Sequence, residues 1–294
     1  MLTEQLPSAP CLVRVMQRGR SKIACWQDGH LVEVGQSLDA LLRLSAAEIR
    51  VALQQAVTAL DPETAPLLAP VESQEVWAAG VTYLQSQEAR VKESGSDLYT
   101  RVYGADRPEL FFKSAGWRAV PHEGEVGIRR DSDWNVPEPE LAVLSNSRGE
   151  VIAYTCGNDM SSRSIEGENA LYLPQAKVYD RSCSIGPAAV LAWHVDPSAA
   201  EIRMRIERGG QEAFCGTAQA SDMVRVPAEL VQVLHSSYPL PDGAWLLTGT
   251  SIVPPQTYTS EGGDLVTIEI GGIGRLVNRL VSVPHSGATA RPRL

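Results

Sequence analysis

Two glutamates share one short, rigid segment of the sequence. In VPEPELAVL, residues 136–144, one proline stands before Glu138 and another before Glu140. A residue before proline is driven out of the α region, so the segment is extended, and side chains two positions apart project to the same face. Their Cα atoms are then about 7 Å apart. In a partly dry site two such carboxylates repel, and one takes up a proton unless a cation lies between them.

A third carboxylate, Asp159, ends an apolar run in the turn GND. On a neighbouring strand it completes a set of three hard oxygen ligands, which suits Mg²⁺ and also Mn²⁺ or Ca²⁺. The five histidines are dispersed, which disfavours a zinc site. Each motif alone also has a simpler interpretation, a solvated edge strand for VPEPEL and an Asx turn for Asp159.

A lysine follows in LYLPQAKVYDRSCSIGP, residues 171–187, where Lys177 and Asp180 stand among apolar or small residues. An ammonium group near an acidic metal centre balances charge or carries a proton. The alternative is a salt bridge at the end of a strand. These residues together favour a metal site with an adjacent lysine.

The first 70 residues predict a small α+β unit. Ser37 caps a short helix over LDALLRL, and Ser45 with Glu48 forms a capping box for a second helix that Asp61-Pro62 ends. A proline-rich linker follows over 61–73. Three strands precede the helices, and a tight Asp28-Gly29 turn joins the last two; they span residues 11–17, 21–27 and 30–35.

Beyond Val76 the pattern predicts short strands that position the acidic residues. A charged helix, LQSQEARVKES, interrupts them and stops at Gly95. With few helices between the strands, the pattern favours a mostly antiparallel sheet or barrel over a βαβ array. The glycines at 271, 272 and 274 indicate a hairpin turn. The strands are VWAAGVTY, PELFFK, EVGIRR, ELAVL, EVIAYTCG, AAVLAWHV, EIRMRIE, WLLTGTSIV and LVTIEIGG.

Composition excludes several classes of function. The chain has 294 residues and a net charge of −9, so nothing favours nucleic acid or an anionic membrane as a partner. No secretory signal and no apolar run near the roughly 20 residues of a membrane span is visible. The five cysteines are scattered, which predicts free thiols in a reducing cytoplasm.

A series of short motifs in fixed order resembles the fumarylacetoacetate hydrolase superfamily, over about residues 76–282. Within it, VPEPEL, IEGEN, LYLPQAKVYD and the run Arg129-Arg130-Asp131 are similar to the 2-keto-3-deoxy-D-arabinonate dehydratase branch. The superfamily motifs lie at residues 80–83, 111–113, 138–141, 157–163, 176–180, 186–187 and 248–250.

The resemblance implies an α+β, mostly β fold, a mixed β-sandwich roll. With the pattern of the first 70 residues and the linker, it predicts a small N-terminal α+β domain over residues 1–72, a catalytic domain over 73–285 and a tail over 286–294. It also implies a homodimer or homotetramer that acts on a small 2-oxo acid.

For the site, the resemblance implies that Glu138, Glu140 and Asp159 bind Mg²⁺, with Lys177 beside the metal as a catalytic group. Thr250 is implied as a hydroxyl and amide donor near the substrate carboxylate. The remaining substrate-binding residues expected from the motifs are Tyr83, Ser86, Arg163, Asp180 and Gly249.

Two departures from the superfamily pattern bear on the reaction. Its hydrolases activate water with a His-and-Glu pair on the helix after the first motif, whereas this helix has Ser86 and Glu88 and no histidine. Ser164 also stands where an aspartate often follows the arginine, which leaves open how Arg163 is oriented.

A metal held by a 2-oxo acid polarises the carbonyl and acidifies the protons at C3. Elimination then needs a base at C3 and an acid at C4, which Lys177 and Glu88 supply between them. Glu166 and Glu168 are the alternatives to Glu88 for this role, and the simpler interpretation of Glu88 is a solvated residue on a charged helix.

The sequence thus predicts a dehydratase of a pentonate-like 2-keto-3-deoxy acid. The alternatives are an acylpyruvate-type C–C hydrolase, a 2-oxo acid decarboxylase and a non-catalytic metal-binding homologue. We expect the segment 84–107 to close over the site as a lid.

Overall fold

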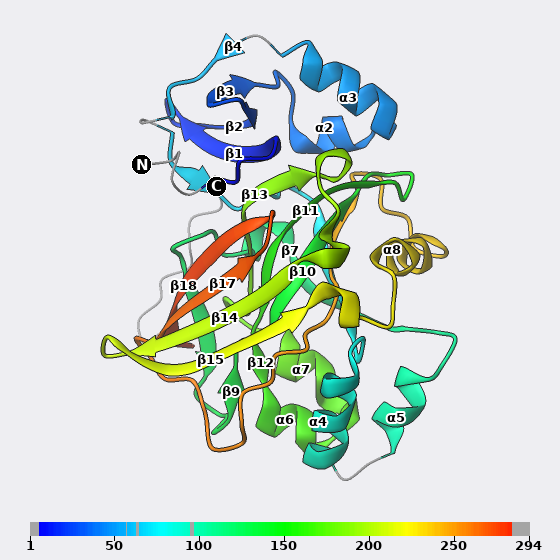
Figure 1. Cartoon of the computed structure of the whole chain (residues 1–294), viewed down its shortest axis with the longest axis vertical. Coiled ribbons are helices and arrows are strands. Elements are labelled where there is room, and N and C mark those ends of the chain that lie inside the picture. The colour runs from blue at the N-terminus through cyan, green and yellow to red at the C-terminus, as the bar shows by residue number, and fades with distance from the viewer. Residues whose placement is uncertain (1–5, 57, 63–64, 95–96, 284–294) are drawn as a thin grey trace.

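The computed structural model describes residues 6–56, 58–62, 65–94 and 97–283 (Figure 1). Its larger sheet follows the order β4-β3-β2-β1-β13-β11-β10-β16-β6-β7, with β5 paired to β1 at the side. The strands of this sheet are β1 (Cys11–Gln17), β2 (Arg20–Gln27), β3 (His30–Glu33), β4 (Thr58–Ala59), β5 (Leu67–Leu68), β6 (Glu75–Gly80), β7 (Glu109–Ala115), β10 (Pro139–Ser145), β11 (Val151–Asp159), β13 (Cys183–Leu191) and β16 (Ala244–Leu247).

A second sheet of five strands packs against one face of the larger one, and a two-strand ribbon pairs with neither. The second sheet has the order β15-β14-β17-β18-β8, made of β8 (Glu125–Arg129), β14 (Glu201–Arg208), β15 (Gln211–Gln219), β17 (Leu265–Ile270) and β18 (Gly274–Val283). The ribbon pairs β9 (Asn135–Val136) with β12 (Ser161–Ser162).

Pairing in both sheets is mostly antiparallel, as the sequence predicts. Two pairs are parallel, β16 with β6 and β18 with β8, so the sheets are mixed. Neither sheet closes on itself, so of the two predicted arrangements the open sheet is confirmed. The glycine-rich hairpin turn is also confirmed, because it joins β17 to β18 with Gly272 at a φ of +73°.

The main core lies between the two sheets. Strand β14 alternates exposed and buried residues, so that Ile202, Met204 and Ile206 face inward and join β1, β11 and β13 in one apolar cluster. The opposite face of the larger sheet is covered by helices (Figure 1). These are α2 (Leu38–Leu42) and α3 (Ala46–Gln54) near the N-terminus and α8 (Pro227–His235) along the other side.

Helix caps near the N-terminus follow the sequence. Ser37 caps α2, and Ser45 with Glu48 forms the expected capping box of α3. Helix α3 ends at Gln54, earlier than predicted, because the chain soon pairs as β4 with β3 and makes sheet hydrogen bonds there. Strand β1 pairs with β13, so strands from both sides of the predicted boundary at residue 72 belong to one sheet.

The remaining helices gather at one end of the sheets, where β10 begins and β11 ends (Figure 1). They are α4 (Leu84–Ser94), α5 (Leu98–Tyr103), α6 (Arg163–Glu168) and α7 (Leu173–Lys177). Single 3₁₀ turns complete the described chain, at Gly116–Arg118, Ala170–Tyr172, Ala192–His194, Pro197–Ala199 and Ala220–Asp222. Within the described ranges, no helix is long and apolar enough to cross a membrane.

Candidate active site

Glu138, Glu140 and Asp159 come together in the structure. Glu138 directly precedes β10, Glu140 is the second residue of that strand, and Asp159 is the last residue of the neighbouring β11. The backbone N–H of Asp159 donates to the carbonyl of Glu138 at 2.9 Å, which fixes the strand ends together. All three side chains are buried, and one oxygen from each lies within 4.8 Å of the others.

Glycines allow the backbone to approach these carboxylates. Gly157 lies opposite Glu140, where a Cβ would overlap the side chain of Leu247. Gly249, with a φ of +93°, donates its backbone N–H to Oε2 of Glu140 at 2.6 Å. A Cβ there would overlap the hydroxyl of Thr82, so the donor is available only from glycine.

Cations surround Glu138. The Lys177 ammonium donates to its Oε2 at 2.5 Å, while Arg163 and Arg90 reach its Oε1 at 2.9 and 3.1 Å. Burial alone would raise the pKa of the Glu138 carboxyl, but the charges of Lys177 and the two arginines outweigh burial and hold that pKa far below its usual range. Glu138 is therefore ionised.

Asp159 forms ion pairs with two lysines. Asp159 pairs with the fully buried Lys113 at 2.5 Å and with Lys177 at 3.2 Å. Lys113 also donates to the backbone carbonyl of Met160 at 2.9 Å. Burial would lower the pKa of the Lys177 ammonium, yet the charges of Asp159 and Glu138 raise it overall.

Glu140 has the opposite electrostatics. Burial first, and then the charges of Asp159 and Glu138, raise the pKa of its carboxyl well above the usual value. A proton on Glu140 relieves this repulsion, and a divalent cation among the three carboxylates would relieve it better. The donor set is all hard oxygen, so the residues fit Mg²⁺.

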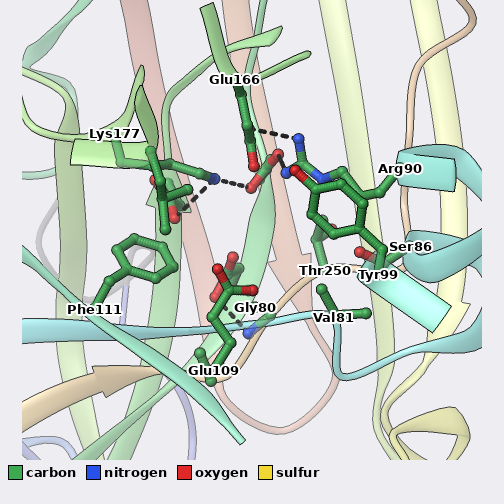
Figure 2. Close-up of a pocket in the computed structure, with 16 residues that line it drawn as sticks. Gly80, Val81, Ser86, Arg90, Tyr99, Glu109, Phe111, Glu166, Lys177 and Thr250 are labelled. Carbon is green, nitrogen blue, oxygen red and sulfur yellow. Dashed lines mark hydrogen bonds and ion pairs between the residues drawn. The ribbon is translucent and has the colours of Figure 1, made fainter. Parts of the chain in front are cut away.

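A pocket of about 340 Å³ opens beside the carboxylates, and Figure 2 shows Arg90, Glu166 and Lys177 directed toward one another on its wall. Glu166 accepts from Ser161 at 2.9 Å and pairs with Arg90 at 2.5 Å. The wall is formed by Ala79, Gly80, Val81, Ser86, Arg90, Tyr99, Glu109, Phe111, Glu138, Glu140, Asp159, Glu166, Leu173, Lys177, Gly249 and Thr250.

The structure brings only part of the predicted substrate-binding and catalytic set to this wall. Ser86, Lys177, Gly249 and Thr250 line it together with the metal-ligand candidates. Arg163 does not line it but contacts Glu138, which orients the guanidinium without the aspartate common in the superfamily. Ser164 instead hydrogen-bonds Ser132 at 2.8 Å.

Three predicted residues lie elsewhere. Glu88 is exposed on the outer side of α4. Asp180 is exposed and lies 3.9 Å from Arg181. Tyr83 is buried and its backbone forms a β-bridge with Met223; burial and then the charge of Glu140 raise the pKa of its hydroxyl, but it does not line the pocket wall. The roles expected of these three stay untested predictions.

Glu109 is a pocket residue that sequence reasoning missed. Burial and then the charge of Glu166 raise the pKa of its carboxyl. It stands opposite Gly80, where any Cβ would overlap its carboxylate. The signal was present, because Glu109, Phe111 and Lys113 alternate along PELFFK and so face the site from one side of β7.

Arg90 and Tyr99 were also missed. They come from α4 and α5, the segment expected to form a lid, and both line the pocket. No motif marks them, because each is one polar or aromatic residue on a helix of ordinary composition. Glu166, considered as an alternative acid, is in the pocket, whereas Glu168 is absent from its described wall.

Comparison with known proteins agrees with this fold. Residues 75–281 match the family model described as fumarylacetoacetate (FAA) hydrolase C-terminal. The chain belongs to this family, and the resemblance predicted from its motifs is confirmed.

Particular relatives lie within one branch of the family. The chain is 51% identical over 216 residues to the probable 2-keto-3-deoxyxylonate dehydratase of Haloferax volcanii, covering 73% of this chain and 74% of that protein. It is 39% identical over 214 residues to the 2-dehydro-3-deoxy-D-arabinonate dehydratase of Saccharolobus solfataricus, covering 71% and 72%. A solved structure of 2-keto-3-deoxy-D-arabinonate dehydratase complexed with magnesium and 2,5-dioxopentanoate aligns with a TM-score of 0.81 at 32% identity, covering 92% of this chain and 99% of that one.

Proposed function

We propose that the protein is a metal-dependent dehydratase of a 2-keto-3-deoxy sugar acid, a pentonate, and removes its C4 hydroxyl as water. The observation that carries the proposal is the buried carboxylate triad beside a pocket that holds both Lys177 and Glu109. The named activity of two relatives supports the same reaction. The 2,5-dioxopentanoate in the related structure has the composition of a five-carbon 2-keto-3-deoxy acid less one water.

Glu138, Glu140 and Asp159 would hold the metal. When bound, Mg²⁺ supplies positive charge that polarises the 2-oxo group of the substrate and acidifies the protons at C3. Thr250 and Gly249 line the adjacent wall, and the Thr250 hydroxyl is the candidate donor to the substrate carboxylate. This divides the pocket into an end for the 2-oxo acid group and an end for the sugar hydroxyls.

Lys177 is the candidate base at C3. Its ammonium bonds Glu138 and Asp159, and these charges keep it protonated. With a divalent cation held by the same carboxylates, Lys177 would be less stabilised as the ammonium and could become the neutral amine that proton removal requires. Lys177 Nζ then accepts the C3 proton while the C3–H electron pair forms the new double bond.

Glu109 is the candidate acid at C4, a role that the geometry favours for it over Glu88. Burial and then the charge of Glu166 raise the pKa of its carboxyl, which favours the protonated form on the pocket wall. As the C4–O bond breaks, Glu109 donates its proton and the leaving hydroxyl departs as water. The proton on Lys177 then returns to Glu109 and regenerates both groups. The elimination product has a C3=C4 double bond and keeps its C5 hydroxyl, and it isomerises to the 2,5-dioxo acid by loss of one proton from C5 and one from the C5 hydroxyl and gain of one each at C3 and C4.

Water attack on a carbon–carbon bond is less well supported. Such hydrolysis needs a base with a pKa near neutrality. Among the described residues of the pocket wall there is no histidine. A non-catalytic role is also disfavoured, because all three candidate ligands are present and converge.

The test is incubation of the purified protein and Mg²⁺ with 2-keto-3-deoxy pentonates and hexonates, acylpyruvates and oxaloacetate, followed by mass spectrometry. We expect a pentonate to lose one water. Two fragments from an acylpyruvate, or CO₂ from oxaloacetate, with no dehydration of any sugar acid would overturn the proposal. The cytoplasmic location and the homodimer or homotetramer stay predictions from the sequence.

A further inference from the structure

Helix α4 presents one polar face to the pocket. Ser86 and Arg90 are four residues apart, so they lie on the same side of the helix, and both are buried in the pocket wall. Glu88 and Lys92 are exposed on the other side. The helix therefore covers the site with one buried positive charge.

Arg90 bridges two carboxylates of different kinds. One nitrogen lies 3.1 Å from Oε1 of Glu138, and the other lies 2.5 Å from Oε2 of Glu166. Glu138 belongs to the candidate metal triad, whereas Glu166 lies outside it on α6. Only 8% of the Arg90 side chain is exposed, so these contacts are poorly screened by water.

We propose that Arg90 is a positioning residue with two roles. Its contact with Glu166 docks α4 over the pocket. Its contact with Glu138 neutralises that carboxylate when no metal is bound, and a divalent cation displaces Arg90 from it. The inference rests on the proposed metal site and extends it to the covering helix. Metal loading and the docking of α4 are linked because both act on Glu138.

The positive charges around Glu138 explain why a divalent cation would displace Arg90. Glu138 already receives Lys177 on one oxygen and both Arg163 and Arg90 on the other. A carboxylate has about four lone-pair positions, and these three contacts take three of them, so a metal would share Glu138 with three cations at close range. A divalent ion and the guanidinium on one buried carboxylate also repel each other.

Of the three cations that contact Glu138, Arg90 is the easiest to displace. Arg163 is fully buried, and its backbone N–H donates to Trp134 at 2.8 Å. Lys177 binds two members of the triad at once. Arg90 keeps Glu166 when it leaves Glu138, so it is the partner that loses least by the exchange.

The test is the affinity for Mg²⁺ alone, measured by calorimetry on the whole protein with no substrate. Arg90→Met removes the competing charge, so we expect the Kd for Mg²⁺ to fall about five- to tenfold. Arg90→Gln, which keeps a polar side chain, should tighten binding in the same direction. Lys92→Met is the matched control, since it removes the same charge from the exposed side of α4, and we expect no change.

Glu166→Gln separates the docking of α4 from the competition between Arg90 and Mg²⁺ for Glu138. It removes the anchor of Arg90 but leaves the contact with Glu138, so amide hydrogen exchange over residues 84–94 should accelerate, as in Arg90→Met, without tighter Mg²⁺ binding. Weaker or unchanged Mg²⁺ binding in both Arg90 variants would overturn the inference and leave the metal site intact. Wild-type protein that binds no Mg²⁺ would instead overturn the proposed metal site itself.

Discussion

Four glutamates around one pocket have pKa values shifted in opposite directions because their neighbours differ. Lys177 and two arginines hold the pKa of Glu138 far below its usual range, and the charges of Arg90, Lys177 and Arg163 together outweigh burial and lower the pKa of Glu166. Burial and nearby negative charge raise the pKa of Glu140 and of Glu109. Such divergence of like groups is how one site provides both a ligand and an acid.

Glu109→Gln tests the assignment of the acid. The amide keeps the shape of the side chain but has no proton to give, so we expect kcat to fall about 100-fold or more. Steady-state kinetics with the substrate found in the mass-spectrometric screen measures this effect. The Mg²⁺-dependent rise in thermal midpoint should remain, because Glu109 is outside the triad.

The pH dependence of kcat gives an independent measure of Glu109. A general acid acts in its protonated form, so kcat should fall as pH rises through the raised pKa of this carboxyl. That alkaline limb should be missing from the residual activity of Glu109→Gln. Glu88→Gln is the control, since Glu88 is exposed outside the pocket, and an equal loss in that variant would contradict the assignment.

The metal ligands are tested without turnover. Mg²⁺ or Mn²⁺ should raise the thermal midpoint of the wild-type protein, because a ligand that binds the folded state stabilises it. Glu138→Ala combined with Glu140→Ala should abolish both the rise and the activity. Differential scanning fluorimetry with and without metal measures the response, and an undiminished rise in the double variant would sink the ligand assignment.

The sequence predicted the triad because two of its members share one rigid segment and the third ends an adjacent apolar strand. Arg90 and Glu109 could not be inferred in the same way. Arg90 meets Glu138 from 48 positions away along the chain, and Glu109 reaches the pocket through the pairing of β7 with β6. Contacts of this kind depend on packing between remote elements, which no local pattern records.

The Glu109 side chain has room beside β6 because the residue opposite it, Gly80, has no side chain. Gly80 stands opposite Glu109, and a Cβ at Gly80 would overlap its carboxylate. We expect Gly80→Ala to displace that carboxylate and lower kcat about tenfold or more, since small misplacements of a reacting group are costly.

The structure of the strand should survive this change. Gly80 lies in a regular strand and not at a positive φ, so alanine is compatible with its backbone. Circular dichroism and the Mg²⁺ response should match the wild type. Unaltered kcat in Gly80→Ala would show that the position of the Glu109 carboxylate is not set by β6.

Secondary structure was predictable where caps or strong periodicity mark it. The capping box of α3 and the strand β14 are such cases. The sequence did not predict α6 and α7, because helices of five or six residues are unstable alone and exist here through packing around the site. Strand β15 was missed because its mostly exposed residues give no strong apolar alternation.

The N-terminal segment and the rest of the chain share one core. Strand β1 pairs with β13, and Leu41 and Ile49 of the N-terminal helices join Leu144 and Trp245 in one buried cluster. The larger sheet is thus completed on one side by residues that precede the predicted boundary at 72. A stable scaffold of this kind holds β10 and β11 in register, and that register sets the distances within the triad.

Removal of residues 1–72 should therefore prevent the remainder from folding, because it uncovers β13 and one face of the larger sheet. We expect residues 73–294 to lack near-ultraviolet circular dichroism, a cooperative thermal transition and a response to Mg²⁺. Leu41→Ala is a less disruptive change in the same buried cluster. It leaves a cavity under a fully buried side chain, so it should cost about 2–5 kcal/mol of unfolding free energy and still respond to Mg²⁺. A truncated chain that melts cooperatively and is stabilised by Mg²⁺ would establish instead that residues 73–285 fold as an independent domain.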